Sequence, residues 1–527
     1  MDRRRLTALL IVLLIPRAVE AGSPDLRPSE RAMLIGYARD TWRSFEALAL
    51  PSGLPSDLLT KSGDGWATAH YTSPSDIAAY LWSTIAAEDL KVIDRTQASG
   101  RLAATLAALG KLERPHGFFL NWYDPRDGSP LKTWPGGGPV RPFLSTVDNG
   151  WLAAALIMVR NARPEFRQPA DDLLAPMQFG FFYDPYDATN PGLHPGLLRG
   201  GYYTDDSTFA PFHYGMLNTE ARIASYVGIA RGQLPKDHYY RMSRARPPAG
   251  DGQAPTGRGE VREYQGVAVA EGFRAYRGLR VVPSWDGSMF EALMVALFVP
   301  EAEWAPEGWG INHPLYVRAS IEDATHEGRL PAWGASPSSI PGGGYRVYGV
   351  TGLSVDGRKV EAAADSVMTP HASFLALPFA PREALDNMEV LAGRFKAYGS
   401  LGFLDAVDVA SGKVAECELA LDQGMIMASL ANVLDDRTIQ RAFSDGMVAE
   451  VIRPLIAPER FGSGVETREV RSSAAPEAPG WRKPLPADGP KLNWGALDPS
   501  KLLTAARFDR PLLRFAARSL GYFARVD

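Results

Sequence analysis

The chain has 527 residues, and its 56 lysines and arginines against 60 aspartates and glutamates give a formal charge of -4. Without a basic excess to neutralise phosphates, the chain is not expected to bind nucleic acid. Hydrophobic residues make up 45% and charged residues 22%, which excludes a mostly disordered chain and a multi-span membrane protein. The single cysteine, Cys417, can form no internal disulfide, and the eight histidines show no zinc-site spacing. We expect a large globular protein without metal or cofactor.

The first residues have the pattern of an export signal. Three arginines at 3–5 precede an apolar run at 6–15, and small residues flank Glu20 at a cleavage position. The alternative is a membrane anchor, but this run is shorter than the roughly 20 residues that span hydrocarbon. We therefore expect cleavage after Ala21 and a secreted or periplasmic protein with no integral membrane span.

Beyond the signal, apolar residues recur with helical spacing along most of the chain. Ser73 can cap a helix, Pro74 fits its first position and Asp76 follows in its first turn. Asp94 can cap the next helix, so these two neighbouring helices should form a hairpin. The same signals predict further helices near 29–48, 148–163, 165–178, 214–231, 287–298, 313–328, 370–379, 381–397, 422–434 and 436–450.

Long segments rich in glycine, proline and aromatic residues separate the predicted helices, at 116–147, 180–213, 301–312 and 331–369. Strand signals are sparse, and the clearest lies at 342–355. Paired helices suit an open α-solenoid or a closed α/α toroid. Because long loops in compact domains are usually functional, we favour a mainly α toroid with these four loops gathered at one end.

The C-terminal part has a different composition. Five prolines between 474 and 490 predict an extended linker. After it, an amphipathic helix starting near Asp509 is expected either to bind a membrane surface or to dock on the main domain, and we favour docking. The sequence thus divides into a signal peptide over 1–21, a helical domain over 22–462, and a Pro-rich linker with a C-terminal amphipathic helix over 463–527. We expect a monomer.

Aromatic and acidic residues stand together in the predicted loops and helix starts, whereas serine-nucleophile, P-loop and dinucleotide motifs are missing. Aromatic rings stack on the apolar faces of sugars, and carboxylates and amides bind their hydroxyls. Hydrolysis of a glycosidic bond needs a protonated acid and a second carboxylate. The mixture therefore indicates a carbohydrate ligand. It is found at 121–124, 145–151, 283–294, 304–316, Trp333 and Tyr345.

Glu291 is the sharpest candidate for the acid. It stands just inside a predicted helix start beside Trp285 and Phe290, an apolar setting that raises a carboxyl pKa. The alternative is a first-turn glutamate favoured by the helix dipole. Asp148 and Asp422 each precede an apolar helical pattern, so each is either a helix cap or a site carboxylate.

Six short motifs occur in the order seen in the glycoamylase-like family, which the chain resembles from about 30 to about 461. They are Thr72-Ser73-Pro74-Ser75-Asp76, Asn121-Trp122-Tyr123-Asp124, Ser145-Thr146-Val147-Asp148-Asn149-Gly150, Thr219-Glu220-Ala221-Arg222-Ile223-Ala224-Ser225, Gly287-Ser288-Met289-Phe290-Glu291 and Asp422-Gln423-Gly424. The family includes endo-β-1,2-glucanases and the cyclisation domains of cyclic β-1,2-glucan synthases. The resemblance implies an (α/α)6 toroid and a glycoside hydrolase or transglycosylase acting on a β-linked glucan, β-1,2-glucan among the candidates.

The resemblance also implies roles for individual residues. It assigns Glu291 as the general acid and puts Asp148 and Asp422 in the sugar-binding cleft. Two routes for the second proton stay open: one of these aspartates is the base, or a substrate hydroxyl passes the proton on. The residues expected to contact the sugar are Trp122, Tyr123, Asp124, Asn149, Trp151, Glu220, Arg222, Trp285, Trp309, His313, Trp333, Tyr345, Asp405 and Gln423.

One position departs from the family. Many members carry a glutamate after a Trp-Gly-Ile-Ser stretch, whereas residues 333–336 here are followed by Pro337. A non-catalytic carbohydrate-binding protein on the same toroid is therefore the alternative, although binding alone does not require three carboxylates. A helical scaffold for protein partners fits the aromatic and acidic loops worst.

The export signal gives a first prediction. Secreted protein should begin at Gly22, because signal peptidase cleaves after small residues that follow an apolar run. Mass spectrometry of the mature protein measures this directly. Secreted material that still contains Met1 or Arg3 would contradict it.

Overall fold

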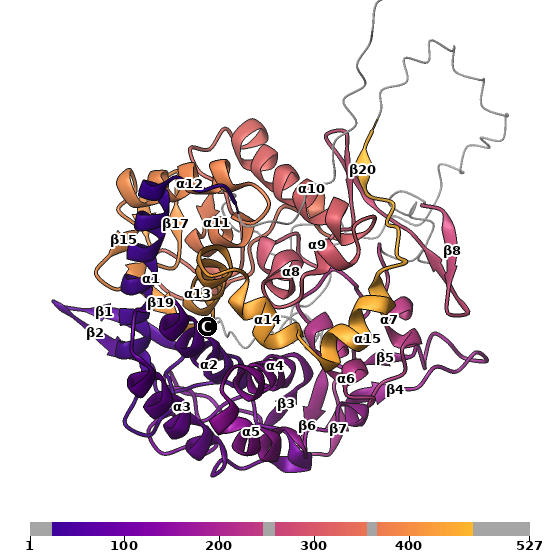
Figure 1. The fold of residues 1–527 in the computed structure, drawn as a ribbon, viewed down its shortest axis with the longest axis horizontal. Coiled ribbons are helices and arrows are strands. Elements are labelled where there is room, and N and C mark those ends of the chain that lie inside the picture. The colour runs from indigo at the N-terminus through magenta and orange to yellow at the C-terminus, as the bar shows by residue number, and fades with distance from the viewer. Residues whose placement is uncertain (1–23, 246–258, 356–365, 467–527) are drawn as a thin grey trace, which may run out of the picture.

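The computed structural model describes residues 24–245, 259–355 and 366–466, and it is mainly helical, as predicted (Figure 1). The predicted signal peptide, the proline-rich segment at 474–490 and the C-terminal helix lie outside the described residues. The α-helices are α1 (Pro28–Leu48), α2 (Pro74–Asp89), α3 (Arg95–Leu109), α4 (Thr146–Ala162), α5 (Arg167–Leu174), α6 (Arg222–Ala230), α7 (Asp237–Arg241), α8 (Met289–Leu293), α9 (Glu301–Trp304), α10 (Trp309–Glu322), α11 (Pro370–Ala376), α12 (Pro381–Gly393), α13 (Ala420–Leu434), α14 (Thr438–Ser444) and α15 (Met447–Ile456).

The helices lie in an inner and an outer layer. Every residue of α6, α8, α11 and α13 is buried, and α2 and α4 are buried along most of their length. A helix that is apolar all round must be covered on all sides. By contrast α1, α3 and α12 bury one face only. Figure 1 shows α3, α5, α10 and α12 toward the rim and α2, α4, α8 and α13 nearer the middle.

The inner helices pack against one another in chain order. Contacts run from α2 to α4 and from α4 to α6, and from α8 through α11 and α13 back to α2. Between α6 and α8, the Arg222 side chain donates to the Ala292 carbonyl at 3.1 Å. Outer helices cover this layer, with α3 on α2, α5 on α4, α10 on α8, α12 on α11 and α1 on α13. The predicted hairpin of the first two helices after 73 is confirmed by the contact of α2 with α3.

The predicted start of α2 is confirmed in atomic detail. Ser73 Oγ accepts a hydrogen bond from the Asp76 N–H at 3.2 Å, and Asp76 Oδ2 accepts one from the Ser73 N–H at 2.8 Å. This reciprocal pair satisfies two backbone donors that a helix leaves open at its start. Asp94 and Gln97 make the equivalent pair at α3.

Several predicted boundaries are wrong. The helix expected at 214–231 begins only at Arg222. The helix expected at 436–450 is two helices, because Gly446 has a φ of 77° and ends the regular backbone between α14 and α15. The segment 301–312, expected to be a loop, contains α9 and the start of α10.

Short antiparallel strands are more frequent than the sparse sequence signals predicted. Most have two to five residues, too short for a periodic pattern to be detected. Within 342–355, only Tyr345–Arg346 is a strand. The strands are β1 (Leu58–Ser62), β2 (Gly65–Thr68), β3 (Phe143–Ser145), β4 (Tyr183–Asp184), β5 (Leu197–Leu198), β6 (Gly201–Tyr203), β7 (Thr208–Phe209), β8 (Val261–Tyr264), β9 (Val267–Ala270), β10 (Arg274–Tyr276), β11 (Leu279–Val281), β12 (Ser338–Ser339), β13 (Tyr345–Arg346), β14 (Val367–Met368), β15 (Tyr398–Gly399), β16 (Gly402–Phe403), β17 (Val407–Asp408), β18 (Lys413–Val414), β19 (Cys417–Leu419) and β20 (Gly464–Val465).

These strands form small separate sheets in the segments between helices. The order β19-β1-β2 joins the segment before α13 to the segment before α2, and Leu58 lies opposite Leu419. β3-β6-β7 joins the segments before α4 and α6. The sheets thus connect consecutive loops at the N-terminal ends of the inner helices.

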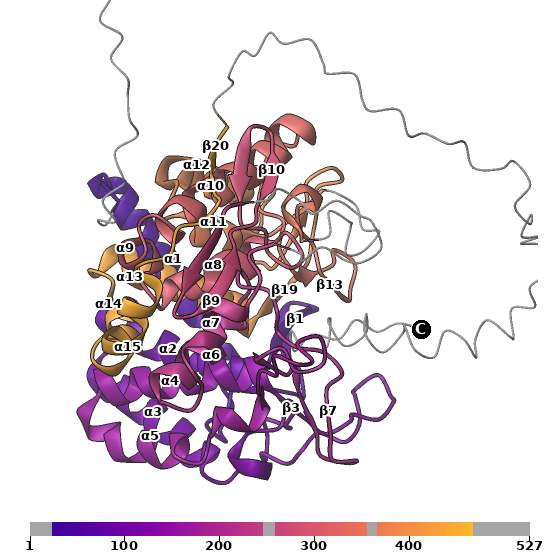
Figure 2. The same ribbon diagram turned by 90° about the vertical axis from the view of Figure 1, so that its right-hand side faces the viewer.

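The long loops do not all lie at one end. Figure 2 shows β3, β7 and β13, which belong to 116–147, 180–213 and 331–369, on one side of the molecule and α9, α14 and α15 on the other. The segment 301–312 follows the C-terminus of α8, and Glu303 pairs there with Arg437 before α14. The prediction is therefore wrong for this segment.

No helix in the described ranges is long and apolar enough to cross a bilayer.

The contact between α4 and α6 yields a prediction about stability. A Cβ on Gly150 would lie 2.7 Å from the Ala224 Cβ and 3.0 Å from its Cα. Gly150→Ala should therefore push α4 and α6 apart and destabilise the fold by about 1–3 kcal/mol, as overpacked cores do. The thermal unfolding midpoint measures this. Gly100→Ala on α3 is the control, because its Cβ would meet nothing within 4 Å and should stabilise the helix by up to about 1 kcal/mol.

Candidate functional site

Carboxyl groups occupy the third position of four inner helices. They are Asp76 on α2, Asp148 on α4, Glu291 on α8 and Asp422 on α13, and all four are buried. The residue that caps α4 is Ser145, and Leu419 precedes α13. Neither Asp148 nor Asp422 is therefore an N-cap, so the helix-cap alternative for these two residues is wrong.

Asp148 is joined to α2. Ser75 Oγ donates to Asp148 Oδ1 at 2.7 Å, and the Asp148 N–H donates to Ser145 Oγ at 3.3 Å. The Asp148 side chain is 2% exposed, and its Oδ2 has no hydrogen-bond partner within the described residues. A buried carboxylate oxygen without a donor is costly, so burial favours the protonated form of this carboxyl.

Glu291 lies against the segment that leads into α6. The Thr219 hydroxyl donates to Glu291 Oε2, and the Glu220 N–H donates to the same oxygen at 3.0 Å. Trp151 Nε1 on α4 donates to Glu220 Oε2 at 2.6 Å. Ser288 caps α8 by accepting from the Glu291 N–H at 3.2 Å. Two glutamates are thus held within one hydrogen-bonded group that spans three inner helices.

Asp422 lies beside a histidine and a second aspartate. His371 Nδ1, in the first turn of α11, is 3.0 Å from Asp422 Oδ2. The Ser339 N–H donates to Asp405 Oδ2 at 2.6 Å, and the Asp405 side chain is 2% exposed. Burial, followed by the neighbouring charge of Asp422, raises the pKa of Asp405 well above its ordinary value. The charge of Asp76 also acts on Asp422, so the carboxylates of α13 and α2 are neighbours.

Burial raises the pKa of each of these carboxyls, to about 6 for Asp148 and to about 7 for Asp422. Burial and then the charge of Asp286 raise the pKa of Glu291 to about 8. The pKa of Glu220 is raised well above its ordinary value by burial and by Glu291. The buried carboxyls at these helix starts form one cluster, which we call the carboxylate group. At neutral pH this cluster contains a protonated Glu291 and a largely ionised Asp148, which together can donate and accept a proton.

Tyr345 lies among these acids. It is 8% exposed, and its pKa is raised well above its ordinary value by burial and then by Asp422, Asp405, Glu220 and Asp286. These acids come from α13 and from the segments that precede α6, α8 and α13, so the phenol lies near Asp422 as well as near Glu220. Tyr345 is one of the predicted sugar contacts.

The predicted aromatic residues lie around the same helix starts. The backbone of Tyr123 pairs with that of Thr72, just before α2. The Trp122 ring centroid is 5.1 Å from that of Trp134. Trp285 precedes α8 and is half-buried. These aromatic residues therefore lie on segments that lead into α8 or that pair with the segment leading into α2.

The loop around Trp333 bridges α8 and α11. The Phe290 N–H donates to Ser336 Oγ at 3.2 Å, and the Thr369 N–H donates to the Gly334 carbonyl at 2.9 Å. Pro337 follows directly. The position at which many family members carry a glutamate thus adjoins the starts of both helices.

Other predicted sugar contacts are occupied by internal bonds. Tyr123 Oη donates to the Glu113 carbonyl at 2.6 Å, Asn149 Nδ2 to the Phe119 carbonyl at 2.9 Å and Gln423 Nε2 to the Phe403 carbonyl at 2.8 Å. Asp124 pairs with Arg126, which lowers its pKa. These side chains fix the loops that carry the site.

Arg222, Trp309 and His313 form a separate group. All three are 0% exposed and surround Glu301, which pairs with Arg222 and lies 3.1 Å from His313 Nε2. The Arg222 guanidinium carbon is 4.5 Å from the Trp309 ring centroid. Within the described residues, none of these three side chains hydrogen-bonds to a carboxyl in the first turn of α2, α4, α8 or α13, although Arg222 is near enough to Glu291 for its charge to act on that group.

Asp57, Asp286 and His371 adjoin this carboxylate group but were not predicted as site residues, and Asp76 was predicted only as a first-turn acid within its motif. Asp57 is 2% exposed, and its pKa is raised by burial and by Asp76 and Asp405. A serine followed three residues later by an acid, before an apolar run, marks Asp76, Asp148 and Glu291 alike. No comparable pattern marks Asp57, which precedes a short strand.

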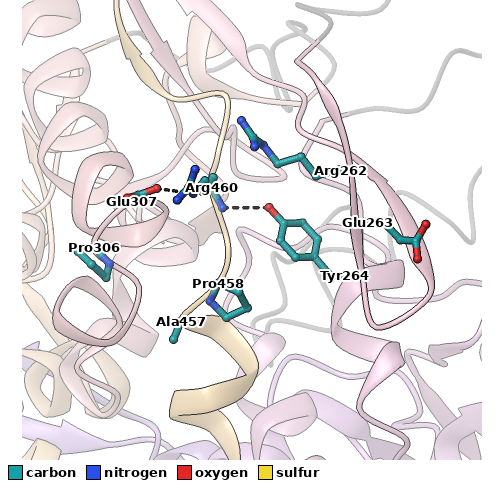
Figure 3. Close-up of a pocket in the computed structure, with 8 residues that line it drawn as sticks. All are labelled: Arg262, Glu263, Tyr264, Pro306, Glu307, Ala457, Pro458 and Arg460. Carbon is teal, nitrogen blue, oxygen red and sulfur yellow. Dashed lines mark hydrogen bonds and ion pairs between the residues drawn. The ribbon is translucent and has the colours of Figure 1, made fainter.

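A pocket lies on the surface of the described part, away from the carboxyls at the helix starts (Figure 3). Its lining residues include none of the predicted site residues, and Arg460 Nε pairs there with Glu307 Oε2 at 2.5 Å. The lining consists of Arg262, Glu263, Tyr264, Pro306, Glu307, Ala457, Pro458 and Arg460. Within the described ranges, no three histidine, cysteine or acidic side chains are arranged to hold a metal ion.

Comparison with known families agrees with the motifs. Residues 254–446 match the glycoamylase family model, described as "Putative glucoamylase", and residues 36–180 match a family described as a protein of unknown function, DUF3131. The first range contains Glu291 and Asp422, and the second contains Asp148. The predicted resemblance to the glycoamylase-like family is confirmed.

Individual proteins resemble this chain in sequence or in fold. The chain is 27% identical over 338 residues to the cyclic β-(1,2)-glucan synthase of Rhizobium meliloti (strain 1021), in an alignment that covers 62% of this chain and 10% of that protein. The chain thus matches about a tenth of its relative's length. It is similar in fold to the endo-β-1,2-glucanase of Chitinophaga pinensis, with a TM-score of 0.58, 16% identity and coverage of 81% and 98% of the two chains. The β-1,2-glucanase of Parabacteroides distasonis gives a TM-score of 0.61 at 15% identity, with coverage of 82% and 60%.

The raised pKa of Glu291 yields a prediction about stability. A folded pKa of about 8 exceeds the ordinary 4.5, so the folded protein holds an extra proton and loses stability as pH rises from about 4.5 through about 8. The free energy of unfolding of Glu291→Gln at pH 8 should therefore exceed that of wild type by at least about 1 kcal/mol, since one pKa unit corresponds to about 1.4 kcal/mol. The variant should accordingly unfold at a higher temperature. At pH 5 the difference should nearly vanish.

Thermal unfolding midpoints at the two pH values measure this difference. Asp124→Asn is the control of opposite sign, because Arg126 lowers the pKa of Asp124 below its ordinary 3.8. That variant should lose stability equally at pH 5 and pH 8. Equal midpoints for Glu291→Gln and wild type at pH 8 would show that Glu291 is ordinarily ionised.

Proposed function

We propose that this protein is an exported glycoside hydrolase or transglycosylase acting on a β-linked glucan, with β-1,2-glucan as the first candidate. The names of its relatives support this choice, because a β-(1,2)-glucan synthase and two β-1,2-glucanases share its sequence or its fold. The site supports it independently, since buried carboxyls and surrounding aromatic rings are the groups that glycosidic bond chemistry needs.

One observation carries the proposal: Glu291 is a buried acid with a pKa raised to about 8 that adjoins an acid with a pKa of about 6, Asp148, through Glu220 and Trp151. A structural glutamate in a first helical turn is stabilised as an anion. Glu291 instead keeps its proton at neutral pH, as a general acid must.

In the proposed reaction, Glu291 gives its proton to the glycosidic oxygen while the bond between that oxygen and the anomeric carbon breaks. In hydrolysis, a water oxygen bonds to the anomeric carbon and its proton passes to the base, Asp148 or Asp422. In transglycosylation, a sugar hydroxyl takes the place of the water. In both cases one proton leaves Glu291 and one reaches the base, so the charges balance.

We assign sugar contacts to Trp122, Trp285, Trp333, Tyr345 and Asp405. The aromatic rings would stack on sugar faces, and the carboxyl and phenol would bind hydroxyls. Asp405 also lies near Pro337, the position at which this chain lacks the family glutamate. It binds the N–H of Ser339, two residues further along, so a carboxyl from another segment stands near the place where the family glutamate is absent. This supports a catalytic protein over one that only binds carbohydrate.

We further propose that the inner helices and their outer partners form an (α/α)6 toroid. Support comes from the chain-order contacts of the inner helices and from the bond between Arg222 and Ala292 across α6 and α8. The domain would span 22–462 in a monomeric, secreted or periplasmic protein. The remaining residues, 463–527, would be the linker and a docking helix.

Turnover of glucan by the Glu291→Gln variant tests the proposed function. The variant keeps shape and hydrogen bonding but has no proton to give, so turnover of β-1,2-glucan should fall by roughly 10²- to 10⁴-fold, while oligosaccharide affinity stays nearly unchanged. Wild type and variant are assayed on a panel of linear and cyclic glucans.

Glu271→Gln is the matched control, because Glu271 is also buried with a raised pKa but bonds to Tyr264 outside the carboxylate group. It should turn over at the wild-type rate. Wild-type turnover by Glu291→Gln would remove Glu291 as the acid and leave Glu220 as the next candidate. Binding of glucans without turnover by the wild-type protein would favour the carbohydrate-binding alternative.

The pH dependence of kcat/KM should be bell-shaped. Activity should rise as the base loses its proton and fall above about pH 8 as Glu291 loses its own. An acidic limb near 6 would identify Asp148 as the base, and one near 7 would identify Asp422. Initial rates between pH 4 and pH 10 measure both limbs. A profile that stays flat up to pH 10 would contradict the assignment of Glu291.

A further inference from the structure

Arg222 and Glu301 form a buried ion pair next to the segments that hold Glu291, the proposed acid. Arg222 Nε and Nη2 donate to the two carboxylate oxygens of Glu301 at 2.7 and 2.9 Å, and both side chains are 0% exposed. Although burial opposes ionisation, the charge and hydrogen bonds of Arg222 lower the pKa of Glu301 to about 2. The pair is therefore ionised at neutral pH.

The Arg222 guanidinium also binds two backbone carbonyls near Glu291, one on the segment before α6 and one on α8. Its Nη1 donates to the Thr219 carbonyl at 2.8 Å, and its Nη2 donates to the Ala292 carbonyl at 3.1 Å. Thr219 is the residue whose hydroxyl donates to Glu291, and Ala292 is the next residue after Glu291 on α8. Arg222 thus connects the donor of Glu291 to the helix that carries Glu291.

Glu301 is held from other directions as well. Tyr226 Oη donates to Glu301 Oε1 at 2.8 Å, and His313 Nε2 lies 3.1 Å from Oε2. Trp309 stacks on His313 with ring centroids 4.9 Å apart, and it also covers Arg222. The carboxylate is therefore fixed by three side chains, and the guanidinium has little freedom to move.

We propose that the Arg222–Glu301 pair is a positioning device that holds Glu291 in register with the Thr219 and Glu220 donors. This inference rests on the proposed function, in which Glu291 is the acid. It gives a reason for burying two charges where an apolar pair of equal volume would serve stability as well. The planar guanidinium reaches one carboxylate and two carbonyls at once, which a lysine ammonium on its flexible stem cannot reproduce in the same geometry.

A double variant tests the proposal. Arg222→Met with Glu301→Leu removes both charges together, so no lone buried charge is left to unfold the protein. If the pair positions Glu291, kcat should fall about 10- to 100-fold with KM nearly unchanged, as expected when the support of a reacting group is lost. Arg222→Lys alone should recover only part of the loss. A merely structural pair would lower the unfolding temperature and leave kcat of the folded protein at the wild-type value.

The matched control is the pair of Arg244 and Glu459, which is also 0% exposed on both sides and bonds to none of the carboxylates at the helix starts. Arg244→Met with Glu459→Leu should change stability and leave kcat unchanged. An equal fall of kcat in both double variants would overturn the proposal, because it would show a general response to loss of buried charge.

A second measurement does not need activity. The protonated carboxyl of Glu291 is identified in wild type by the infrared C=O band that Glu291→Gln removes, and its midpoint is followed with pH. The groups that act on Glu291 are Thr219, Glu220 and Arg222, the Asp286 carboxyl before α8, and the Tyr316 phenol on α10. Since Arg222 lowers the pKa of Glu291, the double variant should move the midpoint to higher pH.

The two readouts separate the possible failures. If wild type cleaves no glucan, the proposed function fails, and a moved midpoint then shows only that the charge of Arg222 acts on the Glu291 carboxyl. If wild type is active and the double variant changes neither kcat nor the midpoint, the positioning role fails and the proposed function stands. If the double variant does not fold, Arg222→Lys takes its place, since it keeps a positive charge opposite Glu301 but loses the planar fork that reaches Thr219 and Ala292; a fall in kcat supports the positioning role, and wild-type kcat overturns it.

Discussion

The structure depends on the burial of carboxyl groups in the first turns of helices that are otherwise surrounded by apolar side chains. Removing a carboxylate from water is unfavourable unless it is paired or keeps its proton. Glu301 is compensated by its ion pair with Arg222, which lowers its pKa to about 2. Asp76, Asp148, Glu291 and Asp422 are held mainly by neutral donors, and burial without such a pair raises their pKa values.

Part of this arrangement could be read from the sequence. The long helices and the hairpin of α2 with α3 follow from apolar spacing and capping residues, and the six motifs pointed to Glu291, Asp148 and Asp422 before any coordinates. The division of α14 from α15 was missed because Gly446 is one glycine in an apolar pattern. The short strands were missed because two or three residues carry no period.

The site was harder to predict than the helices, because one local pattern has several uses. Ser73 with Asp76, Ser145 with Asp148 and Ser288 with Glu291 have the same spacing, yet only Asp76 turns back to its cap. Asp148 and Glu291 bond instead to Ser75 and Thr219, which belong to other segments. Such partners are fixed by tertiary packing. The same holds for Arg222, whose motif suggested a sugar contact and whose environment is an internal ion pair.

The glycines of the inner helices have a consequence for the size of any ligand. A Cβ on Gly150 would meet Ala224, and one on Gly424 would lie 2.7 Å from the Ala79 Cβ. These two contacts set how closely α4 approaches α6 and how closely α13 approaches α2. Asp148, Asp422 and Asp76 stand in the first turns of α4, α13 and α2, so the interaxial distances in the core also set the spacing of these carboxyls. Residues that never touch a ligand can therefore tune which bond the carboxyls can reach, and changes of ligand preference should be sought among the small residues of the core as well as in the loops.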